Sequence, residues 1–245
     1  MQTVSAPRAT PRGSLAWYSS GMHVCLFDVD GTLLLGDGAG RAALEAAIES
    51  ELGLRGPLEK VSFAGRTDRA IVTEMLARNG VEADDATRAR CLRAYIEHLP
   101  THLLRRSGRV LPGIVALLDA LAARDDVAVG VLTGNLREGA RIKLAHFGLD
   151  HYFAFGGYGD DHHERGDVAR AALADAERHL GFAPRPERTW VIGDTPEDVR
   201  CGRAIGARVV VVATGFATVD ELRQAEPDHL LQDFTAPDAL LDLLV

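Results

Sequence analysis

The feature that most constrains the fold is the recurrence of short apolar segments with helical segments between them. The apolar segments are rich in β-branched residues, as buried strands are. They occupy residues 23–29, 127–132, 152–155, 189–192 and 208–213. Residues 137–147, 168–180 and 196–205 show helical spacing of apolar residues. Because strand–helix alternation produces a parallel sheet with helices on both faces, the sequence predicts an α/β, Rossmann-like core.

A different pattern separates the first strand from the second. Residues 39–52, 68–79 and 84–106 look helical, with no strand among them. The flanking sequences GDGAG and SGRVLPG contain the glycine and proline typical of a two-strand hinge. We therefore predict a catalytic core at residues 22–36 and 109–245, with an all-helical domain inserted at residues 37–108.

The first residues of the chain have a composition of their own. Residues 1–21 are rich in Ser, Thr, Pro and Arg and contain no acidic residue. They lack the apolar core of a secretory signal, and they loosely resemble a transit peptide. We expect a disordered tail that is not part of the fold; a targeting segment, or a true start at Met22, are the alternatives.

Composition excludes several classes of protein. The chain has 245 residues, 47% of them hydrophobic and 25% charged, which is typical of a globular protein rather than a disordered or fibrous one. No apolar run approaches the roughly 20 residues of a membrane span. A net charge of -8 argues against nonspecific nucleic-acid binding but not against a small anionic substrate. The three cysteines, widely spaced, indicate no disulfide framework and favour a cytoplasmic location.

Carboxylates gather where the predicted strands end. Asp28 and Asp30 close the first strand, and Asp194 and Asp198 follow the strand at 189–192. The carboxyl ends of parallel strands meet at one edge, where ligands bind, so we expect these carboxylates to converge. Oxygen ligands select a hard cation, with Mg²⁺ the expected ion. Any single Asp could instead cap a helix or start a turn, but compatible groups at successive strand ends disfavour that explanation.

These residues carry a family resemblance. The motif Asp28-Val29-Asp30-Gly31-Thr32, then Thr133, then the stretch GDTPED at 193–198, is similar to the motifs of the haloacid dehalogenase-like hydrolases. The similarity spans roughly residues 22–245. The helical insertion resembles the cap of the phosphoglycolate phosphatase and phosphomutase branch.

The resemblance implies a role for each carboxylate. Asp28 would be the nucleophile that forms an aspartyl-phosphate, and Asp30 the acid and base. Mg²⁺ would bind the Asp28 carboxylate, the backbone carbonyl of Asp30 and the Asp194 carboxylate, while Asp198 orients this metal shell.

The remaining substrate contacts are expected at the same strand ends and in the insertion. The Thr133 hydroxyl and the Gly134 N–H would hold phosphoryl oxygens, with Gly31 and Asn135 beside them. Arg66 stands just before a predicted helix that Thr67 or Asp68 would cap. In relatives this segment faces the active site, so Arg66 is expected to touch the non-phosphate part of the substrate, unless it is simply solvated.

The chain departs from the family at the third motif, where a lysine normally neutralises the nucleophile and the phosphate. Arg165 and Lys143 are the two candidates to replace it. We favour Arg165, because it precedes the helix that leads to the last motif. Lys143 lies well inside the helix at 137–147 and is expected to face water. The acidic and histidine residues at 160–164 are interpreted as a solvated loop rather than as a second metal site.

The resemblance and the residues together predict a Mg²⁺-dependent phosphatase that hydrolyses a small phosphorylated metabolite, with a phosphoglycolate-like anion as the first substrate to test. A phosphomutase of the same superfamily is the main alternative. A haloacid dehalogenase would leave the metal-type carboxylates unexplained, and a catalytically silent protein that binds a phosphorylated ligand would account for the missing lysine. No nucleic-acid or membrane partner is expected, and no oligomeric state is predicted.

Overall fold

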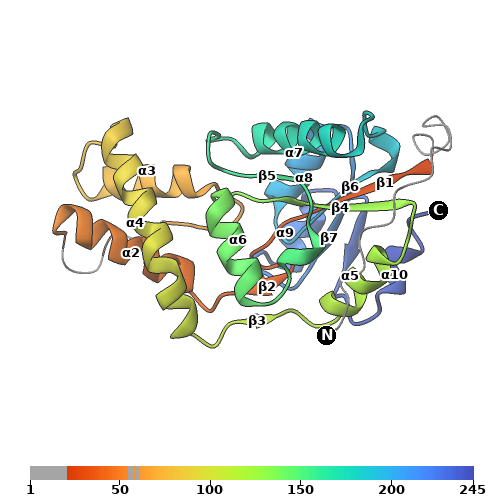
Figure 1. Cartoon of the computed structure of the whole chain (residues 1–245), viewed down its shortest axis with the longest axis horizontal. Coiled ribbons are helices and arrows are strands. Elements are labelled where there is room, and N and C mark those ends of the chain that lie inside the picture. Colours follow the sequence, from red (N-terminus) through yellow and green to blue (C-terminus); the bar gives the residue numbers. More distant parts are fainter. Residues whose placement is uncertain (1–20, 55–57, 59–60) are drawn as a thin grey trace, which may run out of the picture.

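The core of the protein is a parallel sheet with helices on both faces. The computed structural model describes residues 21–54, 58 and 61–245. The predicted N-terminal tail therefore lies outside the described residues, except for Gly21. The sheet has six strands in the order β5-β4-β1-β6-β7-β8, with every neighbouring pair parallel. Figure 1 labels β5, β4, β1, β6 and β7. Its strands are β1 (His23–Phe27), β4 (Val127–Leu132), β5 (Gly156–Gly157), β6 (Thr189–Gly193), β7 (Arg208–Val212) and β8 (His229–Leu231).

The side chains of β1 show how the two helical layers form. Cys25 and Phe27 pack into one apolar cluster with α5 (Ile114–Ala122) and α10 (Asp238–Leu241). Val24 and Leu26 point to the opposite face, as alternate residues of a strand must. There they pack with α7 (Arg165–Leu180) and α8 (Pro196–Ala204). The remaining helices of the core are α6 (Arg137–His146) and α9 (Val219–Gln224). The predicted fold class is confirmed.

Some predicted boundaries are wrong. The first strand ends at Phe27 rather than at Val29, because the chain turns there, with the Leu33 N–H donating to the Val29 carbonyl at 3.0 Å. The strand expected at 152–155 is displaced. A short 3₁₀ helix, η1 (Asp150–Tyr152), occupies its start, and the strand that pairs with β4 is β5. Two glycines form β5, so it carries no apolar pattern.

The insertion after β1 has an apolar cluster of its own. It consists of α2 (Ala39–Leu52), α3 (Asp68–Arg78) and α4 (Asp85–Leu104), which pack through residues such as Leu44, Met75 and Tyr95. In Figure 1 these helices stand apart from the sheet, at the left. The chain enters and leaves through an antiparallel pair, β2 (Leu34–Leu35) and β3 (Arg109–Val110). The described part of the insertion is all-helical, and the domain boundaries at 37 and 108 stay a prediction.

No helix within the described residues is both long enough and apolar enough to span a bilayer.

Candidate active site

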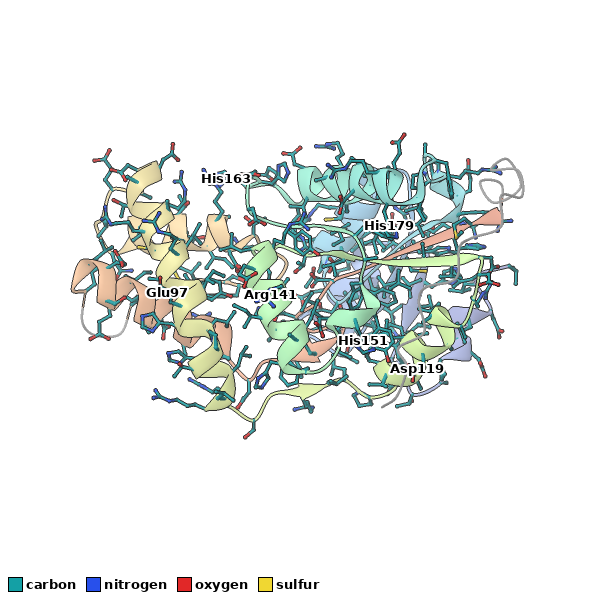
Figure 2. All side chains as sticks on the ribbon, viewed as in Figure 1. Glu97, Asp119, Arg141, His151, His163 and His179 are labelled. Carbon is teal, nitrogen blue, oxygen red and sulfur yellow. The ribbon has the colours of Figure 1, made fainter. Side chains whose placement is uncertain are left out.

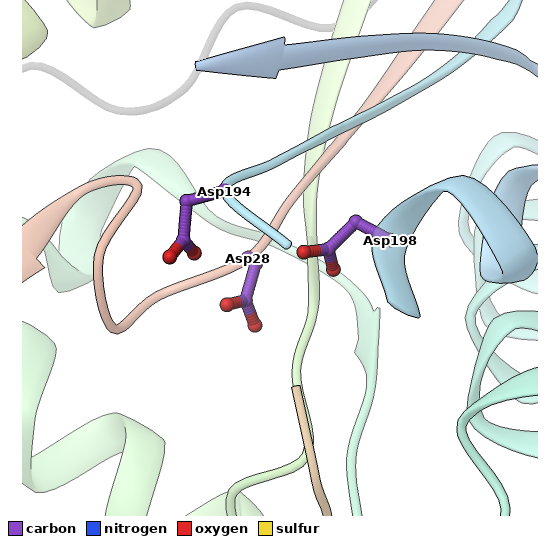
Figure 3. A group of neighbouring side chains, drawn as sticks. All are labelled: Asp28, Asp194 and Asp198. Atoms are coloured by element: carbon purple, nitrogen blue, oxygen red, sulfur yellow. The ribbon is translucent and has the colours of Figure 1, made fainter. Parts of the chain in front are cut away.

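A cluster of buried carboxylates lies beyond the carboxyl ends of β1 and β6. Asp28, Asp194 and Asp198 each offer an oxygen, and these oxygens lie within 4.8 Å of one another. Figure 3 shows the side chains converging from the end of β1, the turn after β6 and the start of α8. Because β1 and β6 are neighbours in the sheet, residues far apart in the sequence meet at this edge.

Asp194 is held by the loops around it. Its Oδ1 accepts a hydrogen bond from Thr32 Oγ1 at 3.2 Å, and its Oδ2 accepts one from the Phe216 N–H at 3.1 Å. Gly31 lies against the same carboxylate, with a φ of 95° and room for no Cβ, which would lie 2.4 Å from Asp194 Oδ2. The Gly31 N–H donates to the Leu34 carbonyl at 2.8 Å. The structure thus gives Gly31 a packing role, and the substrate contact expected of it stays a prediction.

Asp198 is fixed on both of its oxygens. Oδ2 accepts from the N–H and the hydroxyl of Thr195, the N-cap of α8, at 3.0 and 2.7 Å. Oδ1 accepts from Arg165 Nη2 at 2.6 Å. Three protein donors, one of them the Arg165 guanidinium, hold this carboxylate, as suits the orienting role around a metal that the resemblance implies.

Burial makes the cluster unfavourable as three free anions. It raises the pKa of Asp28 to about 7; Arg165 opposes this shift, and the nearby charge of Asp198 adds to it. Burial, and then the charges of Asp198 and Asp28, raise the pKa of Asp194 well above its usual range. A group of carboxylates in this situation retains protons unless a cation replaces them. Oxygen donors of this kind fit a hard divalent ion such as Mg²⁺.

Arg165 lies beside the predicted nucleophile. It is the first residue of α7, its side chain is 5% exposed, and Nη1 and Nη2 lie 3.3 and 3.4 Å from Asp28 Oδ1. Its buried Nε has no hydrogen-bond partner within the described part of the chain. A buried guanidinium is costly unless its charge is paired, and here the carboxylates of Asp28 and Asp198 pair it.

The expectation that Lys143 faces water is wrong. Its side chain is 6% exposed, and Nζ donates to Asp30 Oδ2 and to Asn135 Oδ1, both at 2.5 Å. Lys143 lies about 9 Å along α6 from the first residue of the helix, judged by axial rise alone. Helical side chains lean toward the N-terminus, however, and the long lysine stem covers the remaining distance back to the strand edge.

Asp30 does not join the other carboxylates. Its side chain is 31% exposed and turns to Lys143 and to Asn135, whose Nδ2 donates to Asp30 Oδ2 at 2.8 Å. Strand alternation would place Asp28 and Asp30 on the same side, but β1 has already ended at Phe27. The expected convergence is therefore wrong for Asp30, whose predicted metal contact through the backbone carbonyl stays a prediction.

The expected phosphate contacts lie at the end of β4. Thr133 is buried, and its hydroxyl oxygen accepts hydrogen bonds from Asn135 Nδ2 at 2.8 Å and from the Asn135 N–H at 3.4 Å. Its own O–H is left to donate. The Gly134 carbonyl accepts from the Asp68 N–H at 2.8 Å, and a Cβ at Gly134 would lie 2.1 Å from the Arg66 carbonyl. Glycine is therefore needed for the insertion to approach so closely.

The loop at 160–164 contacts the insertion. Thr67, the N-cap of α3, donates from its hydroxyl to the His163 carbonyl at 3.2 Å. Arg69 Nε lies 2.9 Å from His163 Nε2. Figure 2 shows His163 on the side of the core that faces the helices of the insertion. Among the described residues, the one group with metal-ligand geometry is the cluster around Asp28.

A cavity of about 680 Å³ lies between the sheet edge and the insertion. Core residues line one side of it: Asp28, Asp30, Thr133, Gly134, Asn135, Lys143, Arg165 and Phe216. Residues of the insertion line the other: Arg41, Leu44, Phe63, Arg66, Ile71 and Tyr95, among others. The sequence did not reveal Phe63, Tyr95 or Arg41, because apolar and basic residues at helical spacing look like ordinary core and surface positions. The Arg41 guanidinium stacks 4.1 Å above the Phe63 ring.

Arg66 reaches the cavity wall but is already engaged. Its Nη1 lies 2.5 Å from Glu74 Oε2 and donates to the Ser62 carbonyl at 3.2 Å. To contact a substrate, the Arg66 guanidinium would have to use a nitrogen that Glu74 leaves free, or break its ion pair with Glu74. The predicted substrate contact of Arg66 stays a prediction.

The fold and this site define a class of protein. The chain belongs to the hydrolases of the haloacid dehalogenase-like family, whose model matches residues 22–206. The resemblance and the prediction of a phosphatase-type hydrolase are confirmed.

More particular likenesses follow. The chain is 32% identical over 203 residues to the phosphoglycolate phosphatase of Rhodospirillum rubrum, covering 78% of this chain and 80% of the relative. It is 26% identical over 228 residues to the phosphoglycolate phosphatase of Aquifex aeolicus, covering 91% and 97%. Rhodobacter sphaeroides CbbY, solved in complex with xylulose-(1,5)bisphosphate, has a TM-score of 0.71 at 23% identity, covering 88% and 96% of the two chains, and shows the shared fold.

Proposed function

We propose that this protein is a Mg²⁺-dependent phosphatase that hydrolyses a small phosphorylated metabolite through an aspartyl-phosphate on Asp28. The observation that carries the proposal is the position of Asp28. Its carboxylate lies on the cavity wall, between buried carboxylates suited to a divalent cation and the guanidinium of Arg165. A carboxylate attacks a phosphate dianion only where positive charge reduces their repulsion. Arg165 supplies such charge on one side of Asp28, and a bound Mg²⁺ would supply it on the other.

The residues divide the reaction between them. An oxygen of Asp28 forms the bond to phosphorus while the bond to the ester oxygen breaks, and Asp30 gives its proton to the departing alcohol. Asp30 then takes a proton from the water that attacks the aspartyl-phosphate, which releases phosphate and restores Asp28. Thr133 and Arg165 hold the phosphoryl oxygens in both steps. The Arg165 side chain lies on the cavity wall, beside the carboxylate that attacks.

The metal site is assigned to the buried cluster. Asp28 and Asp194 would hold Mg²⁺ with the backbone carbonyl of Asp30, and Asp198 would orient the shell through Thr195 and Arg165. Bound there, Mg²⁺ supplies the positive charge that neutralises the nucleophile and the phosphate.

A phosphoglycolate-like anion is the first substrate to test, because relatives that match most of the chain are named phosphoglycolate phosphatases. The buried acidic cluster argues against dehalogenation, which needs no metal. The missing lysine was the main support for a catalytically silent binding protein. That support is weakened, because the Arg165 guanidinium contacts Asp28 and can supply the positive charge instead. A phosphomutase would have to keep water from the aspartyl-phosphate, and it remains the enzymatic alternative.

The proposal is tested by turnover of p-nitrophenyl phosphate and of a panel of phosphorylated metabolites. We expect hydrolysis with Mg²⁺ and none in excess EDTA after metal-free purification. Full activity in EDTA would contradict the metal requirement. Absence of turnover on every ester, with binding of a phosphorylated compound retained, would instead support silent binding. Transfer of the phosphoryl group within a sugar phosphate, without release of phosphate, would support a mutase.

Mg²⁺ binding should weaken as the pH falls below about 7. Because burial raises the pKa of Asp28 to about 7, the metal-free protein carries a proton on that carboxyl below this pH, and metal binding releases it. The dissociation constant should therefore rise at least about tenfold per pH unit below 7. Titration calorimetry between pH 5.5 and 8 measures this.

The matched control for that titration is Asp28→Asn, which removes the titrating carboxyl. Its Mg²⁺ affinity should be lower at high pH, with a shallower dependence on pH. A dissociation constant of the native protein that does not change between pH 5.5 and 7 would contradict the assignment of Asp28 to the metal.

A further inference from the structure

We propose that Lys143 is a positioning residue that holds the Asp30 carboxylate for proton transfer, and that it does not serve the phosphate. The inference rests on the proposed function and adds a residue to the acid–base step. The family pattern supplies one cation near the nucleophile. Among the described residues, two buried cations line the cavity wall, and each pairs with a different carboxylate.

Two hydrogen-bond donors hold the Asp30 carboxylate. Lys143 Nζ and Asn135 Nδ2 both donate to Asp30 Oδ2, at 2.5 and 2.8 Å. Lys143 Nζ also donates to Asn135 Oδ1 at 2.5 Å, so the three side chains form a closed triangle. Two donors on one oxygen fix the rotation of the carboxylate. The other oxygen, Oδ1, receives no hydrogen bond from the described residues and is left to exchange a proton with the leaving group.

Lys143 is buried beside the carboxylate that it holds. A lysine that is 6% exposed is costly unless its charge is paired, and lysines are almost never buried without such a partner. Burial alone would lower the pKa of Lys143, but the carboxylates of Asp30 and Asp68 outweigh it and raise the pKa. Lys143 is therefore a charged donor at neutral pH. Asn135, in turn, donates from the same Nδ2 to Thr133 Oγ1 at 2.8 Å, which links the triangle to the end of β4.

Lys143 and Arg165 pair with different carboxylates. Arg165 contacts Asp28 and Asp198. No hydrogen bond of the described residues joins Lys143 to Asp28, and the charge of Asp28 raises the pKa of Lys143 less than the charges of Asp30 and Asp68 do. Removing Arg165 therefore affects the charge around the nucleophile, and removing Lys143 affects the placement of the acid. The two losses should depend differently on the leaving group.

That difference gives the experiment. In Lys143→Met, which keeps the unbranched stem and removes the charge, kcat/KM is measured with p-nitrophenyl phosphate and with the alkyl phosphate that the native enzyme hydrolyses fastest. p-Nitrophenolate is a stable anion that departs without a proton, whereas an alkoxide needs one. We expect kcat/KM to fall about 30- to 100-fold for the alkyl phosphate, the scale of a misplaced general acid, and less than about 3-fold for p-nitrophenyl phosphate.

Three further variants keep the test decisive. Arg141→Met changes a cation on the same helix that is 61% exposed and paired with Glu138, and should leave both values unchanged; Arg141 is labelled in Figure 2. Lys143→Met should cost nothing more for the alkyl phosphate in an Asp30→Asn background, because its effect passes through Asp30. Lys143→Gln, which retains a neutral donor, should recover part of the loss and covers the case in which Lys143→Met does not fold.

Equal losses on both substrates would overturn the proposal, since they would indicate a general structural role or a direct action on the phosphate. No loss on the alkyl phosphate would overturn it as well. The outcome is separable from failure of the proposed function. A native protein that hydrolyses no phosphomonoester refutes the phosphatase assignment, whereas an active native enzyme with an unaffected Lys143→Met refutes only the role of Lys143.

Discussion

Asp28→Asn should lower kcat/KM by about 10⁶-fold, the scale on which another covalently acting hydrolase loses activity without its nucleophile. An amide oxygen is too weak a nucleophile to attack phosphorus, and no other carboxylate of the cluster can replace it. Asp194 is engaged by Thr32 and the Phe216 N–H, and Asp198 by Thr195 and Arg165. The variant should still fold. Burial raises the pKa of the Asp28 carboxyl to about 7, so the folded protein does not depend on a charge at this position.

Mass spectrometry of acid-quenched enzyme distinguishes this loss from a change in the acid–base step. The native enzyme and Asp30→Asn should carry a phosphoryl adduct on Asp28, the latter in larger amount because its hydrolysis is slowed. Asp28→Asn should carry none. An adduct on any other residue, or one that persists in Asp28→Asn, would refute the assignment of the nucleophile.

Much of the fold was predictable because the central strands of a parallel sheet are buried on both faces. Residues 127–132 form β4 as predicted, and β7 differs only at its end. Elements at the edges gave weaker signals. β5 consists of two glycines, and β8, at the opposite edge, is a half-buried run of three residues. Short edge strands share few apolar contacts with the core, so their sequences are less constrained.

The site was predictable where it depends on topology and unpredictable where it depends on side-chain direction. Asp28, Asp194 and Asp198 meet because adjacent parallel strands end at one edge. Asp30 diverges because the turn after Phe27 breaks the alternation of the strand. Lys143 was misjudged because axial rise along a helix ignores the lean of a long side chain toward the N-terminus. The spacing of residues in the sequence shows neither where a strand turns nor which way a long side chain points.

Arg165→Ala should lower kcat/KM by about 10²- to 10³-fold, the value of one donor aimed at developing charge. The guanidinium reaches Asp28 Oδ1 with two nitrogens and Asp198 with one, and the Arg165 side chain lies on the cavity wall. Arg165→Lys should recover only part of the activity. An ammonium is a point charge and cannot meet Asp28, Asp198 and the phosphate in the directions that a planar guanidinium does.

The loss in Arg165→Ala should be the same for p-nitrophenyl phosphate and for an alkyl phosphate, because both present the same phosphoryl group to the guanidinium. The control is Arg170→Ala on the same helix, an arginine that is 59% exposed and paired with Asp167, which should leave kcat/KM within about 2-fold of native. Measured beside Lys143→Met, the pair separates charge at the phosphate from placement of the acid. Near-native activity of Arg165→Ala would show that Arg165 does not replace the lysine of the family.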